Sequence, residues 1–216
     1  MKKIAVILAG CGRMDGSEIH ESVLTLLAIK QNNATYQCFS LDLAQDHVTN
    51  HLDNSTQNES RNMLIESARI ARGEVKSLTE LKLNDYDGLI IPGGNGVAYN
   101  LFDLAKNGKN YTVNPIVSDT CLSFTRAQKP VGFICIAPVM IPKIYGPGVE
   151  LTIGNDDQTV KMLEDLGAIH VECRVDEIHT DLRHKIVTTP AYMLATNIME
   201  AYLGIKRLVD KVVENA

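Results

Sequence analysis

The sequence predicts a single α/β domain with a doubly wound, mostly parallel β-sheet, and three observations support this prediction. Short, wholly apolar runs alternate with longer segments of helical period, which is typical of buried parallel strands connected by helices. The 216 residues fit one domain of ordinary size. No internal repeat, low-complexity run or linker divides the chain, so residues 1–216 are predicted to form one domain with helices on both faces of its sheet.

In the first half of the chain, apolar runs indicate strands and segments with a helical period indicate helices. Residues 3–9 are expected to form a strand, residues 18–31 a helix, and residues 36–41 a second strand. Residues 42–59 are polar and aperiodic, which indicates an inserted loop. A helix at residues 59–72 ends before a glycine, and a strand at residues 87–91 ends before a proline. The first helix is expected to bury its apolar side chains, which are Ile19, Val23, Leu26, Leu27 and Ile29.

The second half continues the same alternation. Residues 113–128 are expected to form a helix, and Pro130 separates it from a strand at residues 131–135. A short apolar helix at residues 137–144, a strand at residues 149–153 and a helix at residues 156–166 come next. Two strands joined by a turn are expected at residues 171–178 and 185–189, before a long amphipathic helix at residues 192–213.

Composition excludes several classes of protein. The formal net charge of −5 provides no general attraction to nucleic acid or to anionic lipid, so neither partner is expected. No apolar run approaches the roughly 20 residues of a membrane span. The five cysteines include no C-x-x-C pair, and His47 and His51 lack a third ligand in sequence, so no disulfide framework and no metal are predicted. The expected location is the reducing cytoplasm.

The glycine-rich stretch after the first strand allows three interpretations. Residues 10–16 nearly match the dinucleotide-binding fingerprint, although Asp15 occupies the position of its third glycine. The stretch can also be a plain turn into the next helix. In the third interpretation it delivers Glu18 or Glu21 into a site, because residues three apart lie on one face of a helix.

Cys135 lies where a predicted strand meets a predicted helix. In open parallel sheets the ligand site lies beyond the carboxyl ends of the strands. A residue at such a sharp corner is strained and presents its side chain above the sheet, as in a nucleophile elbow. The N-terminus of the following helix, with Pro138 in its first turn, is expected to stabilise a thiolate. The alternative is that Cys135 is a small buried apolar residue.

A second strand end carries the turn Pro-Gly-Gly-Asn-Gly at residues 92–96. Glycines allow a positive φ and a close backbone approach, so the N–H groups of Gly94 and Asn95 can point into the same cleft and bind an oxyanion or substrate. A tight turn without a ligand is the alternative interpretation.

Four stretches carry a resemblance to a known family. They are Gly-Cys-Gly-Arg-Met-Asp-Gly-Ser-Glu-Ile-His-Glu at residues 10–21, Arg-Asn-Met-Leu-Ile-Glu at residues 61–66, Phe-Ile-Cys-Ile-Ala-Pro at residues 133–138, and Ile-Val-Thr-Thr-Pro-Ala-Tyr-Met-Leu at residues 186–194. Together they span nearly the whole chain, which resembles the ElbB branch of the ThiJ/PfpI superfamily. That resemblance implies the flavodoxin-like fold of the class I glutamine amidotransferase-like proteins.

The resemblance also implies roles for individual residues. Cys135 is the implied nucleophile, with a carboxylate from the first helix close to its sulfur. Glu21 matches the buried glutamate of the superfamily, and Glu18 is the alternative because the preceding loop is longer here. The N–H groups of Gly94 and Ile136 match the oxyanion hole.

Two departures from the superfamily narrow the chemistry. Ile136 replaces the histidine that follows the cysteine in the protease-like members, and Thr-Thr-Pro-Ala at residues 188–191 stands where amidotransferases have His-x-Glu. A histidine relay is therefore not expected, and neither is glutaminase or peptidase activity.

These residues predict a cofactor-independent glyoxalase that acts on glyoxal or a similar small dicarbonyl. Cys135 adds to the aldehyde to form a hemithioacetal, Glu21 moves a proton between the two carbons, and water releases a 2-hydroxy acid. No metal, glutathione or nicotinamide is expected. The alternative is a non-catalytic protein that uses the same cysteine for redox sensing or partner binding. A homodimer is expected from the resemblance.

Overall fold

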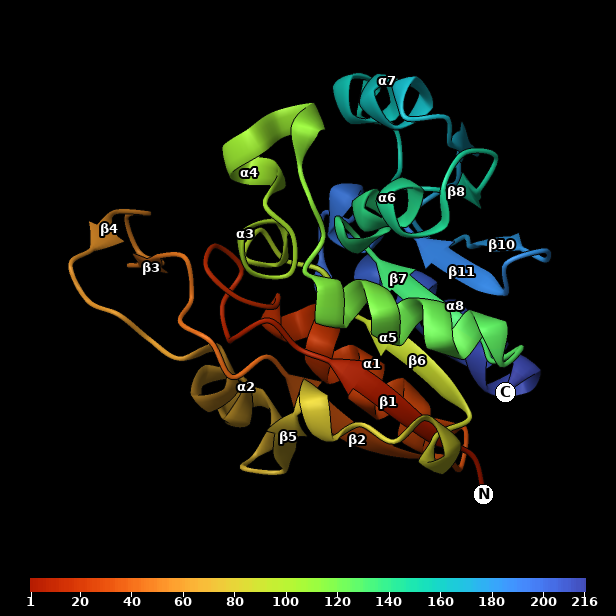
Figure 1. The fold of residues 1–216 in the computed structure, drawn as a ribbon, viewed down its shortest axis with the longest axis horizontal. Helices are drawn as coiled ribbons and strands as arrows, with labels where there is room; N and C mark the ends of the chain where they lie inside the picture. The colour runs from red at the N-terminus through yellow and green to blue at the C-terminus, as the bar shows by residue number, and fades with distance from the viewer.

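The computed structural model describes residues 1–216, and its centre is a seven-stranded sheet (Figure 1). The strand order is β10-β11-β7-β6-β1-β2-β5, and every pairing is parallel except that of β10 with β11. The strands are β1 (Lys3–Ile7), β2 (Thr35–Ser40), β5 (Val75–Ser77), β6 (Gly88–Ile91), β7 (Val131–Ile134), β10 (His179–Asp181) and β11 (Ile186–Thr189).

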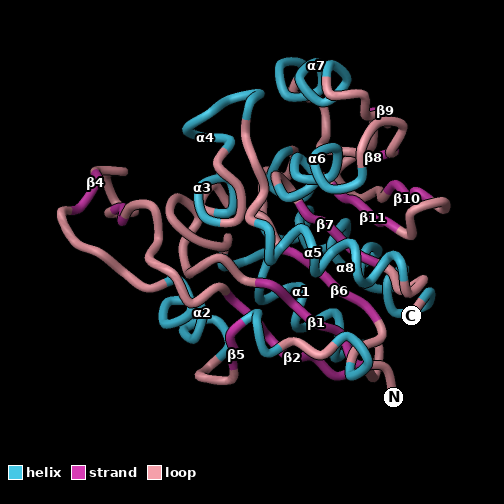
Figure 2. Tube along the Cα trace, viewed as in Figure 1, coloured by secondary structure: helices cyan, strands magenta, loops and turns pink.

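Helices cover both faces of this sheet, as Figure 2 shows. One face packs against α1 (Ile19–Gln31), α2 (Met63–Ala71) and α8 (Ile198–Asn215), and the other against α5 (Pro115–Arg126) and α6 (Ile141–Tyr145). Side chains of β1 alternate between the two cores, because successive residues of a strand point to opposite faces. The predicted doubly wound, flavodoxin-like domain is confirmed.

The remaining elements are short. They are α3 (Val97–Asn100), α4 (Leu104–Asn107), α7 (Asp157–Asp165), the antiparallel pair β3 (Val48–Thr49) and β4 (Thr56–Gln57), and the parallel pair β8 (Glu150–Leu151) and β9 (Ile169–His170). The strand expected at residues 149–153 is therefore two residues long and lies outside the main sheet. None of the helices combines the length and the hydropathy that a membrane-spanning segment requires.

The strand predicted at residues 171–178 is wrong. A turn occupies this segment, because the Glu177 N–H donates to the Arg174 carbonyl and the Arg174 N–H donates to the Glu177 carboxylate at 2.9 Å. Strand structure begins only at His179. The last helix also begins later than expected, at Ile198, where the Asn197 side chain caps its first turn.

The first helix presents a different face to the core from the one its apolar residues predicted. Leu26 and Ile29 are buried as expected, but Ile19, Val23 and Leu27 are 43%, 47% and 47% exposed. The polar side chains of Glu21, Ser22 and Thr25 are buried instead. The inward face of α1 thus places the Glu21 carboxylate at the carboxyl end of the sheet, beside the turn after β6. The expected homodimer stays a prediction. The exposed apolar residues Ile19, Val23 and Leu27 form a face on which a second copy of the chain would bury apolar surface.

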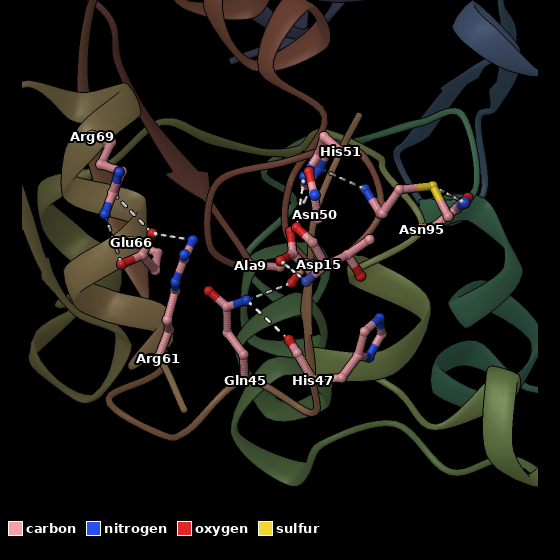
Figure 3. Close-up of polar contacts among 12 residues, drawn as sticks. Ala9, Asp15, Gln45, His47, Asn50, His51, Arg61, Glu66, Arg69 and Asn95 are labelled. Atoms are coloured by element: carbon pink, nitrogen blue, oxygen red, sulfur yellow. Dashed lines mark hydrogen bonds and ion pairs between the residues drawn. The ribbon is translucent and has the colours of Figure 1, made fainter. Parts of the chain in front are cut away.

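The polar loop at residues 42–59 is fastened to the glycine-rich turn after β1 (Figure 3). The buried side-chain carboxylate of Asp15 accepts the Thr49 N–H at 2.8 Å. The backbone carbonyl of Asp15 accepts a hydrogen bond from the Gln45 side-chain amide at 2.8 Å. The Met14 N–H donates to His51 Nε2 at 3.2 Å. These contacts hold the turn in one conformation at the carboxyl edge of the sheet.

Candidate active site

Cys135 occupies the sharp corner directly after β7. Its φ of 62° lies in the left-handed region, which is strained for a residue with a Cβ. The Cys135 N–H donates to the Thr189 carbonyl of β11 at 3.0 Å, so the adjacent strand holds the corner in place. The nucleophile-elbow geometry expected from the sequence is therefore present.

Glu21 is the carboxylate that contacts this cysteine. Its side chain is fully buried and lies beside Cys135, close enough for each group to shift the pKa of the other. Its two oxygens accept the N–H groups of Gly93 at 2.9 Å and Tyr192 at 3.2 Å. Glu18 instead caps α1, where its Oε2 accepts the Glu21 N–H at 2.7 Å. Between the two glutamates that the sequence left open, the structure brings Glu21 to the sulfur.

Backbone N–H groups complete the surroundings of the sulfur. Those of Gly94 and Ile136 lie near Cys135 Sγ and oppose the rise in its pKa, so two donors are close to where an adduct on the sulfur would carry its oxygen. Asn95 lies beside them, but its N–H donates to the Arg13 carbonyl at 2.7 Å and its amide to Met14 Sδ. Asn95 therefore lines the site without adding a free backbone donor.

Burial and mutual repulsion set the protonation of the pair. Burial, with the neighbouring Glu18 charge, raises the pKa of Glu21 from 4.5 to about 7. Burial and the Glu21 carboxylate raise the pKa of Cys135 well above its usual value, although the Gly94 and Ile136 N–H groups oppose this. The thiolate expected from a helix N-terminus is thus not favoured on its own. The segment after Cys135 opens with only a short 3₁₀ turn, Ala137–Met140, and Cys135 is 8% exposed.

A proton shared between Glu21 and Cys135 explains how a buried cysteine can still react. When Glu21 is protonated, its hydroxyl and the two backbone N–H groups can all donate to the sulfur, which is the arrangement that stabilises a buried thiolate. When Glu21 is ionised, it can accept the thiol proton. At a pH above the pKa of Glu21 and below that of Cys135, the pair holds one proton, which can move between the sulfur and a carboxylate oxygen.

A cavity of about 530 Å³ opens above the sulfur. It includes three groups that sequence reasoning did not single out as site residues: Arg13, His20 and Tyr192. The last two share a hydrogen bond of 2.8 Å between His20 Nδ1 and the Tyr192 hydroxyl. The remaining lining residues are Glu18, Gly94, Asn95, Cys135, Ile136, Met193, Ala195 and Thr196.

Tyr192 reaches the site through an unusual backbone conformation. Ala191 has a φ of 44°, which turns the chain after β11 so that the Tyr192 N–H meets Glu21. The residue that follows the Thr-Thr-Pro-Ala stretch thus supplies a backbone N–H donor to Glu21. The only sequence signal was the proline at the strand end.

The glycine-rich turn does not form a phosphate cradle. Four of its N–H groups are already satisfied within the protein: those of Gly10, Gly12, Met14 and Gly16 donate to Ser67 Oγ, the Ser17 carbonyl, His51 Nε2 and the Gly12 carbonyl. A pyrophosphate needs free N–H donors at this place. Of the three interpretations, the structure favours a turn that delivers Glu21 to the site.

A substitution at Gly93 tests how tightly Cys135 and Glu21 are packed. A Cβ at this position would lie 2.6 Å from Cys135 Cβ and 2.8 Å from Glu21 Oε2. Gly93→Ala must therefore displace one partner, and we expect at least about tenfold slower alkylation of Cys135 with a stability loss of about 1–3 kcal/mol. Mass spectrometry after timed iodoacetamide treatment measures the first effect, and thermal melting the second.

Gly73→Ala is the control for this substitution. Gly73 has a φ of +88°, and no other group lies within 4 Å of the place that a Cβ would take, so alanine there strains the backbone far from the site. An unchanged alkylation rate at Cys135 in Gly93→Ala would contradict the packing described here.

The strand-end cysteine, the buried glutamate and the doubly wound sheet define an amidotransferase-like protein of ThiJ/PfpI type. No family model matches the chain. It is 40% identical over 222 residues to the rat ES1 protein homolog, with 98% of this chain and 83% of that protein covered. It is also 40% identical to human glutamine amidotransferase-like class 1 domain-containing protein 3, with 98% and 82% covered.

A solved structure agrees with these relatives. The isoprenoid biosynthesis protein with amidotransferase-like domain from Ehrlichia chaffeensis is 35% identical, superposes with a TM-score of 0.93, and is covered to 99% by the whole of this chain. The chain belongs to this ES1 and ElbB family of the ThiJ/PfpI superfamily. Glyoxalase III from Candida albicans, at 14% identity and a TM-score of 0.65, shares the fold.

The cytoplasmic location expected from the cysteines is contradicted by these relatives. The rat and human proteins are both described as mitochondrial. All five cysteines of this chain are free in the structure. The number and spacing of the cysteines carried no information that distinguishes the cytoplasm from the mitochondrion.

Proposed function

We propose that this protein is a cofactor-independent glyoxalase that converts glyoxal or a similar small dicarbonyl to a 2-hydroxy acid. One observation carries the proposal: the buried Glu21 carboxyl, whose pKa is raised to about 7 by burial, lies beside a strand-end cysteine that lines an open cavity. A group with that pKa can both accept and donate a proton at neutral pH. The reaction needs such a group beside a nucleophile.

The first step is addition of sulfur to the aldehyde. Glu21 accepts the thiol proton, a bond forms between Cys135 Sγ and the aldehyde carbon, and the carbonyl electron pair moves to oxygen. The N–H groups of Gly94 and Ile136 support the negative oxygen. Glu21 then returns its proton to that oxygen, which completes a neutral hemithioacetal and leaves the carboxylate free to act again.

The second step moves one proton between the two carbons of the substrate and one between their oxygens. The Glu21 carboxylate removes the proton from the carbon bonded to sulfur and delivers it to the neighbouring carbon through an enediol, while the proton of the hemithioacetal hydroxyl passes to the neighbouring oxygen. The first carbon is oxidised and the second is reduced by the same electron pair, so the balance requires no external oxidant. Water then hydrolyses the resulting thioester, which releases the 2-hydroxy acid and regenerates the thiol.

Other activities find less support in the site. Glutaminase and peptidase relays use an imidazole as the base, and the contacts of the Cys135 sulfur are with a carboxyl and with backbone N–H groups. His20, the histidine that lines the cavity, pairs with the Tyr192 hydroxyl at 2.8 Å, and His179 pairs with Glu150 at 2.9 Å. A redox sensor requires an accessible thiolate of low pKa, whereas Cys135 is 8% exposed with a raised pKa.

The direct test is turnover of a dicarbonyl panel. Glyoxal and methylglyoxal are incubated with wild-type protein in the absence of thiols and nicotinamides, and the 2-hydroxy acid is quantified by mass spectrometry. Glycolate and lactate are the expected products. Consumption of the dicarbonyl without either product would mean that the protein merely traps the aldehyde as an adduct.

The pH dependence of turnover provides a separate prediction. Because Glu21 must be ionised to remove the carbon-bound proton, kcat should rise with pH through about 7 and then level off. The Glu18 charge contributes to the raised pKa of Glu21. Glu18→Gln removes that charge, so the midpoint of the profile should move to lower pH. The measurement is kcat between pH 5 and 9 for both proteins.

Glu74→Gln is the control, since it removes the same charge from an exposed position on the loop before β5. Its midpoint should equal that of the wild type. A midpoint that stays in place or moves to higher pH in Glu18→Gln would mean that Glu21 is not the group whose titration controls turnover.

A further inference from the structure

The cavity above Cys135 is much larger than the smallest substrate requires. Its volume is about 530 Å³, whereas glyoxal fills about two water volumes, or roughly 60 Å³. Pockets of several hundred Å³ hold ligands with a body beyond the reacting group. Part of the cavity wall is apolar and consists of Ile136, Met193 and Ala195. The cavity therefore has room for an aldehyde that carries an aliphatic tail.

Arg13 makes the cavity suited to a ligand with a negatively charged group. It lines the same cavity and is exposed. Its guanidinium takes part in none of the ion pairs or side-chain hydrogen bonds of the protein, although acidic residues outnumber basic ones in this chain. A planar guanidinium without a partner matches a carboxylate or a phosphate through paired N–H donors.

The backbone beneath Arg13 is held in place. The Asn95 N–H donates to the Arg13 carbonyl at 2.7 Å, which ties the glycine-rich turn to the turn after β6. The next two residues, Met14 and Asp15, are bonded to His51 and Thr49 of the polar loop (Figure 3). A pre-positioned backbone lowers the entropy lost when the side chain closes on a ligand.

The other charged groups of the cavity distinguish the two anions. Glu18 lines the cavity together with Cys135 and is held by the Glu21 N–H at the start of α1, and the Glu21 carboxyl is buried beside the sulfur. A doubly charged phosphate would meet about twice the repulsion from these carboxyls that a singly charged carboxylate meets. One free guanidinium attracts the ligand while these carboxyls repel it, so a ligand group with a single negative charge is favoured over one with two.

We propose that the substrate is a ketoaldehyde with a carboxylate at the far end of an aliphatic tail, and that Arg13 binds this carboxylate. The inference rests on the proposed glyoxalase function for the reacting end and on Arg13 for the tail. Sulfur adds to the aldehyde, the proton moves to the neighbouring carbon, and water releases the product as described above. That product is a 2-hydroxy dicarboxylate, so the reaction still balances without an external oxidant.

The test compares two probes that differ only in tail charge, 4,5-dioxopentanoate and its methyl ester, in the ratio of their kcat/KM values. We expect wild type to prefer the acid by at least about tenfold, the factor that corresponds to about 1.4 kcal/mol. Arg13→Gln should abolish the preference chiefly through KM, and Arg13→Lys should retain part of it. Arg183→Gln, which removes an exposed arginine from the turn between β10 and β11, should behave as wild type.

Two outcomes overturn the role of Arg13 while leaving the glyoxalase intact. In the first, wild type turns over both probes equally well. In the second, Arg13→Gln keeps the preference that Arg183→Gln shows. Either result means that the tail carboxylate is not bound by this residue.

A binding measurement decides the case in which neither probe is turned over, which would defeat the proposed function itself. The product of the acid probe, 2-hydroxyglutarate, should slow iodoacetamide alkylation of Cys135 in wild type and not in Arg13→Gln, because it fills the cavity above the sulfur. Lactate, which lacks the second carboxylate, should protect far less. Absence of protection by 2-hydroxyglutarate overturns the carboxylate site independently of turnover.

Discussion

Cys135→Ser is expected to lose at least about 1,000-fold in kcat for glyoxal and methylglyoxal. The hydroxyl of serine is a far weaker nucleophile than a thiol at neutral pH, and no histidine contacts this position to activate it. The substitution is nearly isosteric, so the contact with Glu21 and the fold should persist. Product formation by mass spectrometry and thermal melting measure the two properties together.

Cys11→Ser is the matched control, since Cys11 is a second thiol at a strand end and is more exposed than Cys135. It should retain wild-type turnover. Wild-type protein treated with glyoxal should also show the adduct mass on the peptide that contains Cys135. Turnover that survives in Cys135→Ser would move the chemistry to another group and remove the basis of the proposed mechanism.

Glu21→Gln is expected to lower glyoxalase turnover by about 100- to 10,000-fold, the usual contribution of a positioned general acid–base group. The amide keeps the shape of the side chain but cannot accept the carbon-bound proton. Addition of sulfur to the aldehyde needs less from this residue than the later proton transfer does. The hemithioacetal should therefore accumulate on Cys135, where intact-protein mass spectrometry detects it.

The residual activity of this variant should also lose the rise in kcat near pH 7, because the titrating carboxyl is gone. Glu66→Gln provides the comparison, since Glu66 on α2 is likewise a buried carboxyl but pairs with Arg61 just before that helix and with Arg69 within it. It should lose stability and keep its turnover and pH profile. Equal losses of turnover in the two variants would show that any buried charge change damages the site.

Local patterns predicted most of the secondary structure, and the errors have identifiable causes. Strands β1, β6 and β7 are almost wholly buried, so their apolar runs were unambiguous. The segment at residues 171–178 was misread because its alternating charges imitate a half-exposed strand, while the Arg174–Glu177 contacts close a turn. The face of α1 was misread because Glu21 turns inward, which leaves the apolar Val23 outside.

The sequence by itself determined the sheet class, the cysteine corner and the pair of glutamates from which the acid–base group comes. These features are local, since each depends on residues close together in the chain. Only the tertiary structure decided that Glu21 rather than Glu18 reaches the sulfur, because the choice depends on how α1 packs against β2, α2 and α8. It also brought the Tyr192 N–H and Arg13 to the same cavity from distant segments. Burial shifts the pKa of Glu21 to about 7, and burial exists only once the sheet and its helices have packed.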